Sequence, residues 1–375
     1  MTKKILVLGG YGNFGKLICG YLVQRSDIEL IIAGRNKEKA DRLCDALKIE
    51  AKCQLSSLLL DIHSASFLQT LNDIHPDIVI HTSGPFQGQD YYVPEACIEA
   101  GCHYIDLADD RRFVCDFHSL NDLATKNNVI AISGASSVPG LSSVVIDHYA
   151  NEFSKLEEID FAIVPGSNVE IGEATLKGIL SYAGRPFKSW EQERFVERYG
   201  WMDSCRMYMG KTLGTRWLAN IDIPDLELFP ARYQGIKTVR FRAGHELGIA
   251  HLSIAFMAFL SRLELVKHLD RYSGKIFRAG QHLKRLGTDC GGMVIQLSGI
   301  NKEGQRLKLI WRLIAKKGVG PRIPTISAIV LANRIVDGDL TEPGARPCLG
   351  LFRLDEFFKI AGEWGIYQEE EKMVG

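Results

Sequence analysis

The sequence predicts an α/β protein with a doubly wound parallel sheet, joined to a second α+β domain on a mainly antiparallel sheet. Three observations predict this: a glycine-rich turn after an apolar N-terminal run, an alternation of short apolar runs with helical stretches through the first third, and hairpin spacing after about residue 150. With 375 residues the chain is long enough for two domains. We expect a first domain over 1–140, a sheet domain over 141–320, and a C-terminal segment over 321–375 that packs back on the first domain.

Composition narrows the classes of function. Hydrophobic residues at 46% and charged residues at 24% are typical of a folded globular protein. Lys+Arg and Asp+Glu both number 45, so no overall charge favours nucleic acid as a partner. The nine cysteines have neither disulfide-framework nor zinc-ligand spacing, so we expect reduced thiols and no metal site. The N-terminus shows no apolar signal region, and the most apolar helical run, 250–260, is too short to cross a bilayer. We expect a cytoplasmic protein without a membrane span.

The first strand and helix are predicted by KILVLGGYGNFGKLI, residues 4–18. An apolar strand run, 5–8, is followed by Gly10-x-Gly12-x-x-Gly15 at the start of a helical pattern, which is the context that this motif requires. Gly10 permits a tight turn, Gly12 lets the backbone approach a pyrophosphate, and Gly15 lets the helix pack on the strand. The pattern is typical of a Rossmann-type dinucleotide site, with these expected contacts: Gly10, Tyr11, Gly12, Asn13, Phe14 and Gly15.

Five further strands and four helices are expected in the first domain. Each strand run is short and apolar, and each helical stretch is long enough for the crossover between parallel strands. The expected strands are 29–33, 58–62, 77–82, 103–107 and 129–133. The expected helices are 37–47, 64–71, 92–100 and 111–127.

The end of the second strand, IIAGRN, predicts which dinucleotide binds. An NAD site usually has Asp or Glu there to accept a hydrogen bond from the ribose 2′-hydroxyl, whereas this chain has Gly34, Arg35 and Asn36. Arg35 can pair with a 2′-phosphate and lay its guanidinium plane on the adenine. We therefore expect NADP(H), with NADPH as the reduced form, held partly by Arg35 and Asn36. The alternative is an arginine that is merely exposed in a loop.

Two other strand ends offer cofactor contacts. Asp61 ends the third expected strand, where it can reach the adenine amino group or, equally, cap the segment that follows. Ser83, Gly84 and Pro85 end the fourth strand, at the edge where ligands bind in such sheets. Gly84 would allow close approach of the nicotinamide ribose, and a plain Gly-Pro turn is compatible with this contact.

The second domain is predicted from its hairpin spacing. Residues 293–316 place Gly304 in a short polar loop between two β-rich runs. TRWLANIDI and IKTVRFRAG indicate further strands, and 325–337 is a strong helix. The EEEK near the end predicts a solvated tail.

Several segments together resemble the saccharopine dehydrogenase-like NADP-binding family. They are GGYGNFG, AGRN, SGPFQGQDYYVPEACIEAGCHYIDLADD and GASSVPGLSS, with weaker likeness in RYQGIKTVRFRAGHELG and clearer likeness in GPRIPTISAIVLANRI and GARPCLGLFRLDEF. The resemblance implies a nucleotide domain with an inserted sheet domain and NAD(P)-linked oxidoreductase chemistry. It does not imply saccharopine as the substrate. It maps the family's nucleotide turn and Gly-Pro element onto Gly10, Gly12, Gly15, Gly84 and Pro85.

Hydride transfer needs a proton donor or acceptor beside the nicotinamide. Asp106, in HYIDLADD at the end of the fifth strand, is the best placed carboxylate, and a cap for the helix that begins at Arg111 is the alternative. His245 and Glu246 form a titratable pair at the end of an expected strand, and a surface histidine beside a structural ion pair is the alternative. We interpret His81 as an interior histidine rather than a base.

The sequence therefore predicts a cytoplasmic NADP(H)-dependent oxidoreductase that acts on a small molecule in the cleft between the two domains. One alternative is an enoyl-type reductase of a lipid-like substrate, with apolar residues around 256–260 lining its pocket. Another is a non-catalytic NADP(H)-binding regulator or scaffold. Whether the chain acts alone or as a homodimer is left open.

Overall fold

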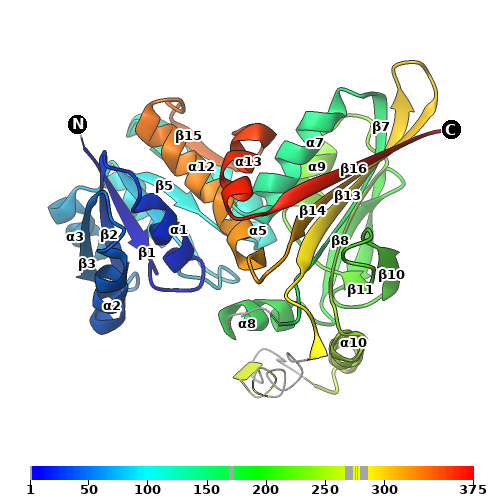
Figure 1. Ribbon diagram of the computed structural model, residues 1–375, viewed down its shortest axis with the longest axis horizontal. Helices are drawn as coiled ribbons and strands as arrows, with labels where there is room; N and C mark the ends of the chain where they lie inside the picture. Colours follow the sequence, from blue (N-terminus) through cyan, green and yellow to red (C-terminus); the bar gives the residue numbers. More distant parts are fainter. Residues whose placement is uncertain (1, 169–172, 267–272, 275, 277, 279–285) are drawn as a thin grey trace. The chain divides into compact units, whose positions relative to one another are not determined.

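The chain forms two compact units in a computed structural model (Figure 1). The first unit consists of Met1–Val144 and Arg322–Phe357, and the second of Val145–Pro321 and Phe358–Gly375. The division into 1–140, 141–320 and 321–375 stays a prediction. The structure describes residues 2–168, 173–266, 273–274, 276, 278 and 286–375.

The first unit is built on a seven-stranded sheet in which every neighbouring pair of strands is parallel. The strand order is β15-β6-β5-β4-β1-β2-β3, so the direction of winding reverses between β1 and β4. This order confirms the predicted doubly wound α/β sheet. The strands are β1 (Lys3–Leu8), β2 (Ile28–Gly34), β3 (Gln54–Leu59), β4 (Ile78–His81), β5 (His103–Asp106), β6 (Ile130–Ser133) and β15 (Gly344–Pro347).

Helices connect these strands. They are α1 (Gly15–Leu22), α2 (Lys37–Leu47), α3 (Phe67–Ile74), α4 (Tyr92–Glu99), α5 (Arg111–Cys115), α6 (Asn121–Lys126) and α12 (Ile323–Asp337). The helix α12 packs against α1 and β5. The expectation of one helix over 111–127 is wrong, because a 3-10 turn, Asp116–Leu120, separates α5 from α6. The strand expected at 58–62 lies earlier in the chain, since β3 is a half-exposed edge strand that tolerates polar residues.

The strand register brings four strand ends to one edge of this sheet. Leu8 is aligned with Ala33 on β2 and with His81 on β4, and His81 is aligned with Asp106 on β5. Because all these strands are parallel, the segments that follow them leave the sheet at the same side. This is the side where ligands bind in doubly wound sheets, beside the point where the strand order reverses.

The second unit is built on a nine-stranded sheet with the order β10-β11-β12-β7-β13-β14-β16, to which the β8–β9 hairpin is attached through β12. The pair β7 and β12 is parallel, and the other pairs are antiparallel. A mainly antiparallel second sheet is thereby confirmed. Its strands are β7 (Phe153–Val164), β8 (Pro186–Glu191), β9 (Arg194–Tyr199), β10 (Cys205–Tyr208), β11 (Thr215–Asn220), β12 (Thr238–His245), β13 (Gly291–Asn301), β14 (Arg306–Ala315) and β16 (Tyr367–Val374).

The hairpin expected over 293–316 is confirmed by the pairing of β13 with β14, and Gly304 takes a left-handed φ of 81° in its turn. The solvated tail expected at EEEK is wrong, since β16 pairs with β14 along its length. One face of the sheet is covered by α9 (Asp225–Arg232), whose Phe229 ring lies 6.0 Å from that of Phe161. Further helices in the described part of the chain are α7 (Ser142–Ala150), α8 (Glu173–Ser181), α10 (Gly248–Arg262) and α13 (Leu354–Glu363).

Among the helices of the described ranges, none has the length and apolar character needed to cross a membrane.

Candidate nucleotide-binding site

The turn between β1 and α1 is packed tightly against its neighbours. Gly9 has a φ of 74°, and a Cβ on it would lie 2.7 Å from Ser83 Oγ. A Cβ on Gly10 would lie 2.9 Å from Ile32 Cγ2, and one on Gly15 would lie 2.3 Å from the Gly9 carbonyl oxygen. The left-handed turn residue is therefore Gly9 rather than the expected Gly10. Gly10 instead allows the turn to approach β2, and Gly15 allows the helix to start against the turn.

Gly12 and the start of α1 leave backbone exposed. A Cβ on Gly12 would contact only the Gly9 carbonyl oxygen, at 3.0 Å. The N-cap residue of α1, Phe14, supplies no side-chain hydrogen bond to the first turn. The first amides of a helix lack intrahelical partners and carry partial positive charge. The Gly12 amide donates to the Gly9 carbonyl oxygen at 2.8 Å. The amides of residues 13–15 therefore offer the donors that suit a phosphate group.

Tyr11 joins this turn to the end of β2. A Cβ on Gly34 would lie 2.5 Å from the Tyr11 ring, and the Tyr11 hydroxyl accepts a hydrogen bond from the Asn36 amide at 2.9 Å. Asn36 also caps α2, with its Oδ1 accepting from the Lys39 amide. Between these residues, Arg35 is exposed and has no hydrogen bond or ion pair with any residue that the structure describes. Its guanidinium can therefore pair with a ligand.

The loop after β4 is fixed from two sides. Thr82 Oγ1 donates to the carbonyl oxygens of the last β1 residue and of the glycine after it, at 2.8 and 3.1 Å. Gln89 Nε2 donates to the carbonyl oxygens of Ser83 and Pro85, at 3.1 and 2.7 Å. These bonds leave Gly84 exposed at the strand end. Sequence reasoning missed Thr82 and Gln89, because their partners are distant carbonyl groups that leave no local pattern.

Asp61 lies just beyond β3, where the Leu60 amide bonds to the Gly34 carbonyl oxygen at 3.1 Å. Its side chain is exposed and accepts a hydrogen bond from the His63 amide at 3.1 Å. The alternative that Asp61 caps the next helix is wrong, because α3 begins at Phe67. The contact with adenine stays a prediction. Residues 9–15, 34–36 and 82–85 are called the cofactor edge below.

Comparison with known proteins shows what this unit is similar to. Residues 5–132 match the family model described as the saccharopine dehydrogenase NADP binding domain. The matched residues lie wholly within the first unit. The whole chain is similar in fold to saccharopine dehydrogenase (L-Glu forming) of Saccharomyces cerevisiae, with a TM-score of 0.71 over 99% of this chain and 100% of that one at 14% identity.

Two curated relatives share part of the sequence. Carboxyaminopropylagmatine dehydrogenase of Synechocystis sp. is 26% identical over 199 residues, which is 48% of each chain. A Mycobacterium tuberculosis protein named as a trans-acting enoyl reductase is 28% identical over 153 residues, or 40% of this chain and 36% of that one. The chain therefore aligns with about half or less of the length of these relatives.

Asp106 ends β5 and is completely buried. Its Oδ1 accepts hydrogen bonds from the amides of Ala108 and Gly134, at 2.9 and 2.8 Å, and from Ser133 Oγ at 3.0 Å. Burial raises the pKa of Asp106 to about 6, although the amide bonds favour the charged form. The helix-cap alternative is wrong, because Asp110 caps α5. A catalytic role for Asp106 stays a prediction.

His81, next to Asp106 across the sheet, is also completely buried. Its Nδ1 lies 2.9 Å from the Tyr104 hydroxyl, and burial lowers the pKa of His81 to about 3. The interpretation of His81 as an interior histidine is confirmed.

His245 lies at the end of β12, and its ring stacks on Trp201 at a centroid distance of 5.5 Å. Its Nε2 is buried and has no hydrogen-bond partner in the described part of the chain. Burial, together with the nearby His251, lowers the pKa of His245 to about 4, so the ring is neutral at pH 7. A proton donated by His245 at neutral pH would therefore come from a neutral imidazole.

Glu246 is held by several partners. Its Oε2 accepts hydrogen bonds from the amides of Ser167 and Thr288, at 2.9 and 2.8 Å, and its Oε1 lies 3.3 Å from Arg216. Burial opposes ionisation, but the Thr288 and Ser167 bonds and the Arg216 charge hold the pKa of Glu246 below its usual value. Glu246 thus takes part in a nearly buried ion pair, and a catalytic role stays a prediction.

The apolar residues expected around 256–260 lie on α10. Phe256 is 61% exposed and Phe259 is 46% exposed. Ile249, Leu252 and Leu263 continue the same helical stripe and are also exposed. The stripe presents an apolar surface to solvent in this structure.

Proposed function

We propose that the protein is an NADP(H)-dependent oxidoreductase that transfers a hydride to or from a small-molecule substrate. The observation that carries this proposal is the cofactor edge of the first unit. Three neighbouring strand ends supply an uncapped helix start, an unpaired arginine and a fixed loop with an exposed glycine. The family model that residues 5–132 match and the dehydrogenase name of the Synechocystis relative support it.

Each part of the cofactor edge suits one part of NADP(H). The amides of residues 13–15 would hold the pyrophosphate, which approaches the backbone beside Gly12, and Arg35 would pair with the 2′-phosphate. Tyr11 and Asn36 would fix the turn that carries Arg35. The loop 83–85 would border the nicotinamide ribose, and Asp61 the adenine. When bound, NADPH supplies the hydride, and the chain's residues position and enclose it.

The proton that accompanies hydride transfer is assigned in this proposal to Asp106, His245 or Glu246. Asp106 has a pKa of about 6, which suits proton exchange near neutral pH, but in this structure it is enclosed by its hydrogen bonds. His245 and Glu246 belong to the second unit. That the substrate lies in the cleft between two domains stays a prediction.

A second candidate is an enoyl-type reductase of a lipid-like substrate. The exposed apolar stripe of α10 favours it, because a stripe of large apolar side chains in water often marks a surface that binds an apolar partner. The name of the Mycobacterium tuberculosis relative points the same way.

Turnover by the purified full-length protein tests both candidates. Small molecules that copurify with it would be identified by mass spectrometry. Each would then be added to the protein as a substrate together with NADPH or NADP+, and the reaction would be monitored through the absorbance of the reduced nicotinamide. Steady turnover supports the oxidoreductase proposal. A rate with enoyl thioesters that rises with chain length favours the second candidate. Tight NADPH binding without turnover of any retained compound contradicts both and indicates a regulator or scaffold.

A further inference from the structure

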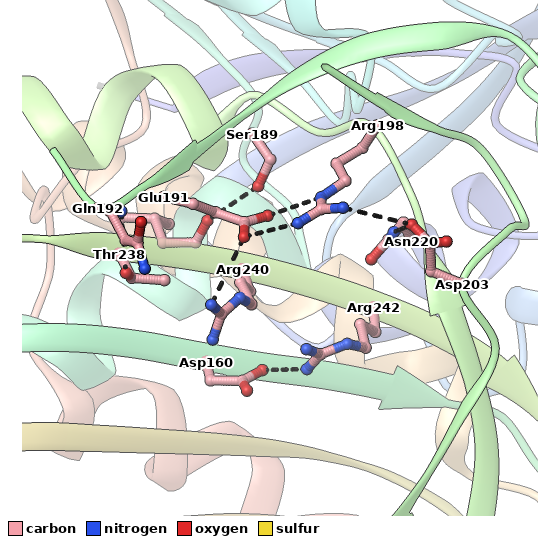
Figure 2. Close-up of polar contacts among 11 residues, drawn as sticks. Asp160, Ser189, Glu191, Gln192, Arg198, Asp203, Asn220, Thr238, Arg240 and Arg242 are labelled. Carbon is pink, nitrogen blue, oxygen red and sulfur yellow. Dashed lines mark hydrogen bonds and ion pairs between the residues drawn. The ribbon is translucent and has the colours of Figure 1, made fainter. Parts of the chain in front are cut away.

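A small pocket opens in the second unit. It has a volume of about 150 Å³ and lies among β8 to β12 and the turn before β10. Three arginines line it: Arg198, Arg240 and Arg242. Figure 2 shows their guanidinium groups together with the carboxylates of Asp160, Glu191 and Asp203. None of these residues belongs to the cofactor edge or to the three acid–base candidates.

The carboxylates nearby are shared unevenly among the arginines. Arg198 makes a two-pronged contact with Glu191, at 2.9 and 2.8 Å. Arg240 reaches the same carboxylate only at 3.5 Å. The hydrogen bond from Arg198, opposed by burial, keeps the pKa of Glu191 below its usual value, so Glu191 is ionised. The guanidinium groups of Arg198 and Arg240 therefore share the carboxylate of Glu191, and Arg198 makes the closer contacts with it.

Arg240 and Arg242 keep unused donors. They stand two residues apart on β12, so both side chains lie on one face of the sheet, while Phe241 between them is buried on the other. Arg242 donates one hydrogen bond to Asp160, and neither arginine has another hydrogen bond or ion pair in the described ranges. Their side chains are 34% and 16% exposed. Each guanidinium has five N–H groups, so several remain available to a ligand in the pocket.

The charges of the pocket indicate which anion it suits. Its lining carries three arginines and two carboxylates, Glu191 and Asp203, and a third carboxylate, that of Asp160, pairs with Arg242, so the charges of the cluster balance. The planar fork of a guanidinium matches a carboxylate geometrically. On another side of the pocket, Asn220 donates to Asp203 at 2.9 Å, and their remaining oxygens can accept hydrogen bonds. A small monocarboxylate that also carries a hydrogen-bond donor fits these features better than a phosphate dianion, because it adds at most one negative charge to the balanced cluster.

We propose that this pocket binds a small monocarboxylate bearing a hydroxyl or amine, with the carboxylate held by Arg240 and Arg242. The bound carboxylate fills the unused donors of these two guanidinium groups. The ligand's hydroxyl or amine donates to Asp203 or Asn220. This inference does not depend on cofactor binding, because all these residues lie in the second unit.

Calorimetric titration of the full-length protein without NADP(H) tests the proposal, with lactate, glycine and inorganic phosphate as probes at constant ionic strength. Lactate or glycine should bind saturably, and Arg242→Gln or Arg240→Gln should weaken that binding by about 10-fold to 100-fold, since each removes a charge-assisted contact. Arg306→Gln, at an exposed position on β14, is the matched control and should leave it unchanged.

Several results would overturn the proposal. Absence of saturable binding to either carboxylate would do so. So would equal binding in wild type and in both pocket variants, provided that their circular dichroism and melting temperatures match those of the control. Tighter binding of phosphate than of both carboxylates would contradict the assignment of the ligand class. Because NADPH titrations are separate, failure here leaves the proposed function untouched.

Discussion

Asp106 illustrates how burial changes a single side chain. Its carboxyl has a pKa of about 6 in the folded protein, whereas an aspartate carboxyl in an unfolded chain has a pKa of about 3.9. The folded state therefore holds this proton more tightly. This tighter binding adds about 3 kcal/mol to the free energy of unfolding. The contribution is fully present below about pH 4 and is lost as the pH rises through about 6. The lowered pKa of His81 has the opposite effect, because its folded form resists protonation as the pH falls.

Asp106→Asn separates these two effects and tests the carboxyl's role. Asparagine keeps the oxygen that accepts the bonds from Ala108 and Gly134, and it does not ionise. Urea unfolding should show the variant gaining up to about 3 kcal/mol relative to wild type between about pH 4 and pH 7. Parallel pH curves would mean that the carboxyl is not perturbed. If the variant folds but loses turnover, Asp106 is catalytic; unchanged turnover assigns it to structure.

Single residues were predictable from sequence where local chemistry decides their role. The glycines at 10, 12 and 15 could be found because their spacing follows from a strand, a turn and a helix. The positive φ at Gly9 and the Tyr11 bond to the Asn36 amide could not, because both depend on how β2 approaches the turn. The pocket arginines did leave a signal, since Arg240 and Arg242 alternate with apolar residues along one strand.

At the scale of elements, the β1–α1 unit gives a matched pair of variants. A Cβ on Gly12 meets one carbonyl oxygen at 3.0 Å, whereas a Cβ on Gly15 would come within 2.3 Å of backbone. Gly12→Val should therefore fold with a near wild-type melting temperature and lose NADPH affinity, because valine occupies the space for the pyrophosphate. Gly15→Val should lower the melting temperature by several degrees. Equal melting temperatures for the two variants, or unchanged NADPH titration of Gly12→Val, would contradict this geometry.

Elements were predicted well where the apolar pattern is strong. The buried strands and the 293–316 hairpin follow from it, whereas β16 did not. Its run of glutamates predicts a solvated tail. In the folded strand, however, Glu371 pairs with Arg312 and Lys372 pairs with Glu152. Edge strands pair through backbone and exposed charges, so hydrophobic patterning contains little information about them.

At the scale of the whole molecule, the sequence predicted a parallel sheet followed by a mainly antiparallel one, and the comparison of folds agrees. If substrate binds in a cleft between domains, cofactor and substrate together should draw the domains closer. Solution X-ray scattering should then show a smaller radius of gyration with both ligands than with either one alone. Identical scattering profiles with and without saturating ligands would contradict a cleft that closes.

The central claim is that the cofactor edge binds NADP(H) through Arg35, and calorimetric titration of NADPH and NADH into wild type and Arg35→Asp tests it most directly. The substitution removes a charge-assisted contact of about 1.5 to 3 kcal/mol and adds a repulsion, so NADPH affinity should fall by about 10-fold to 100-fold or more. NADH lacks the 2′-phosphate, so its affinity should stay near the wild-type value. The ratio of NADPH affinity to NADH affinity should therefore fall strongly. Arg42→Asp, on the exposed side of α2, is the control and should change neither affinity. An NADPH/NADH ratio that stays at its wild-type value in Arg35→Asp would contradict the account.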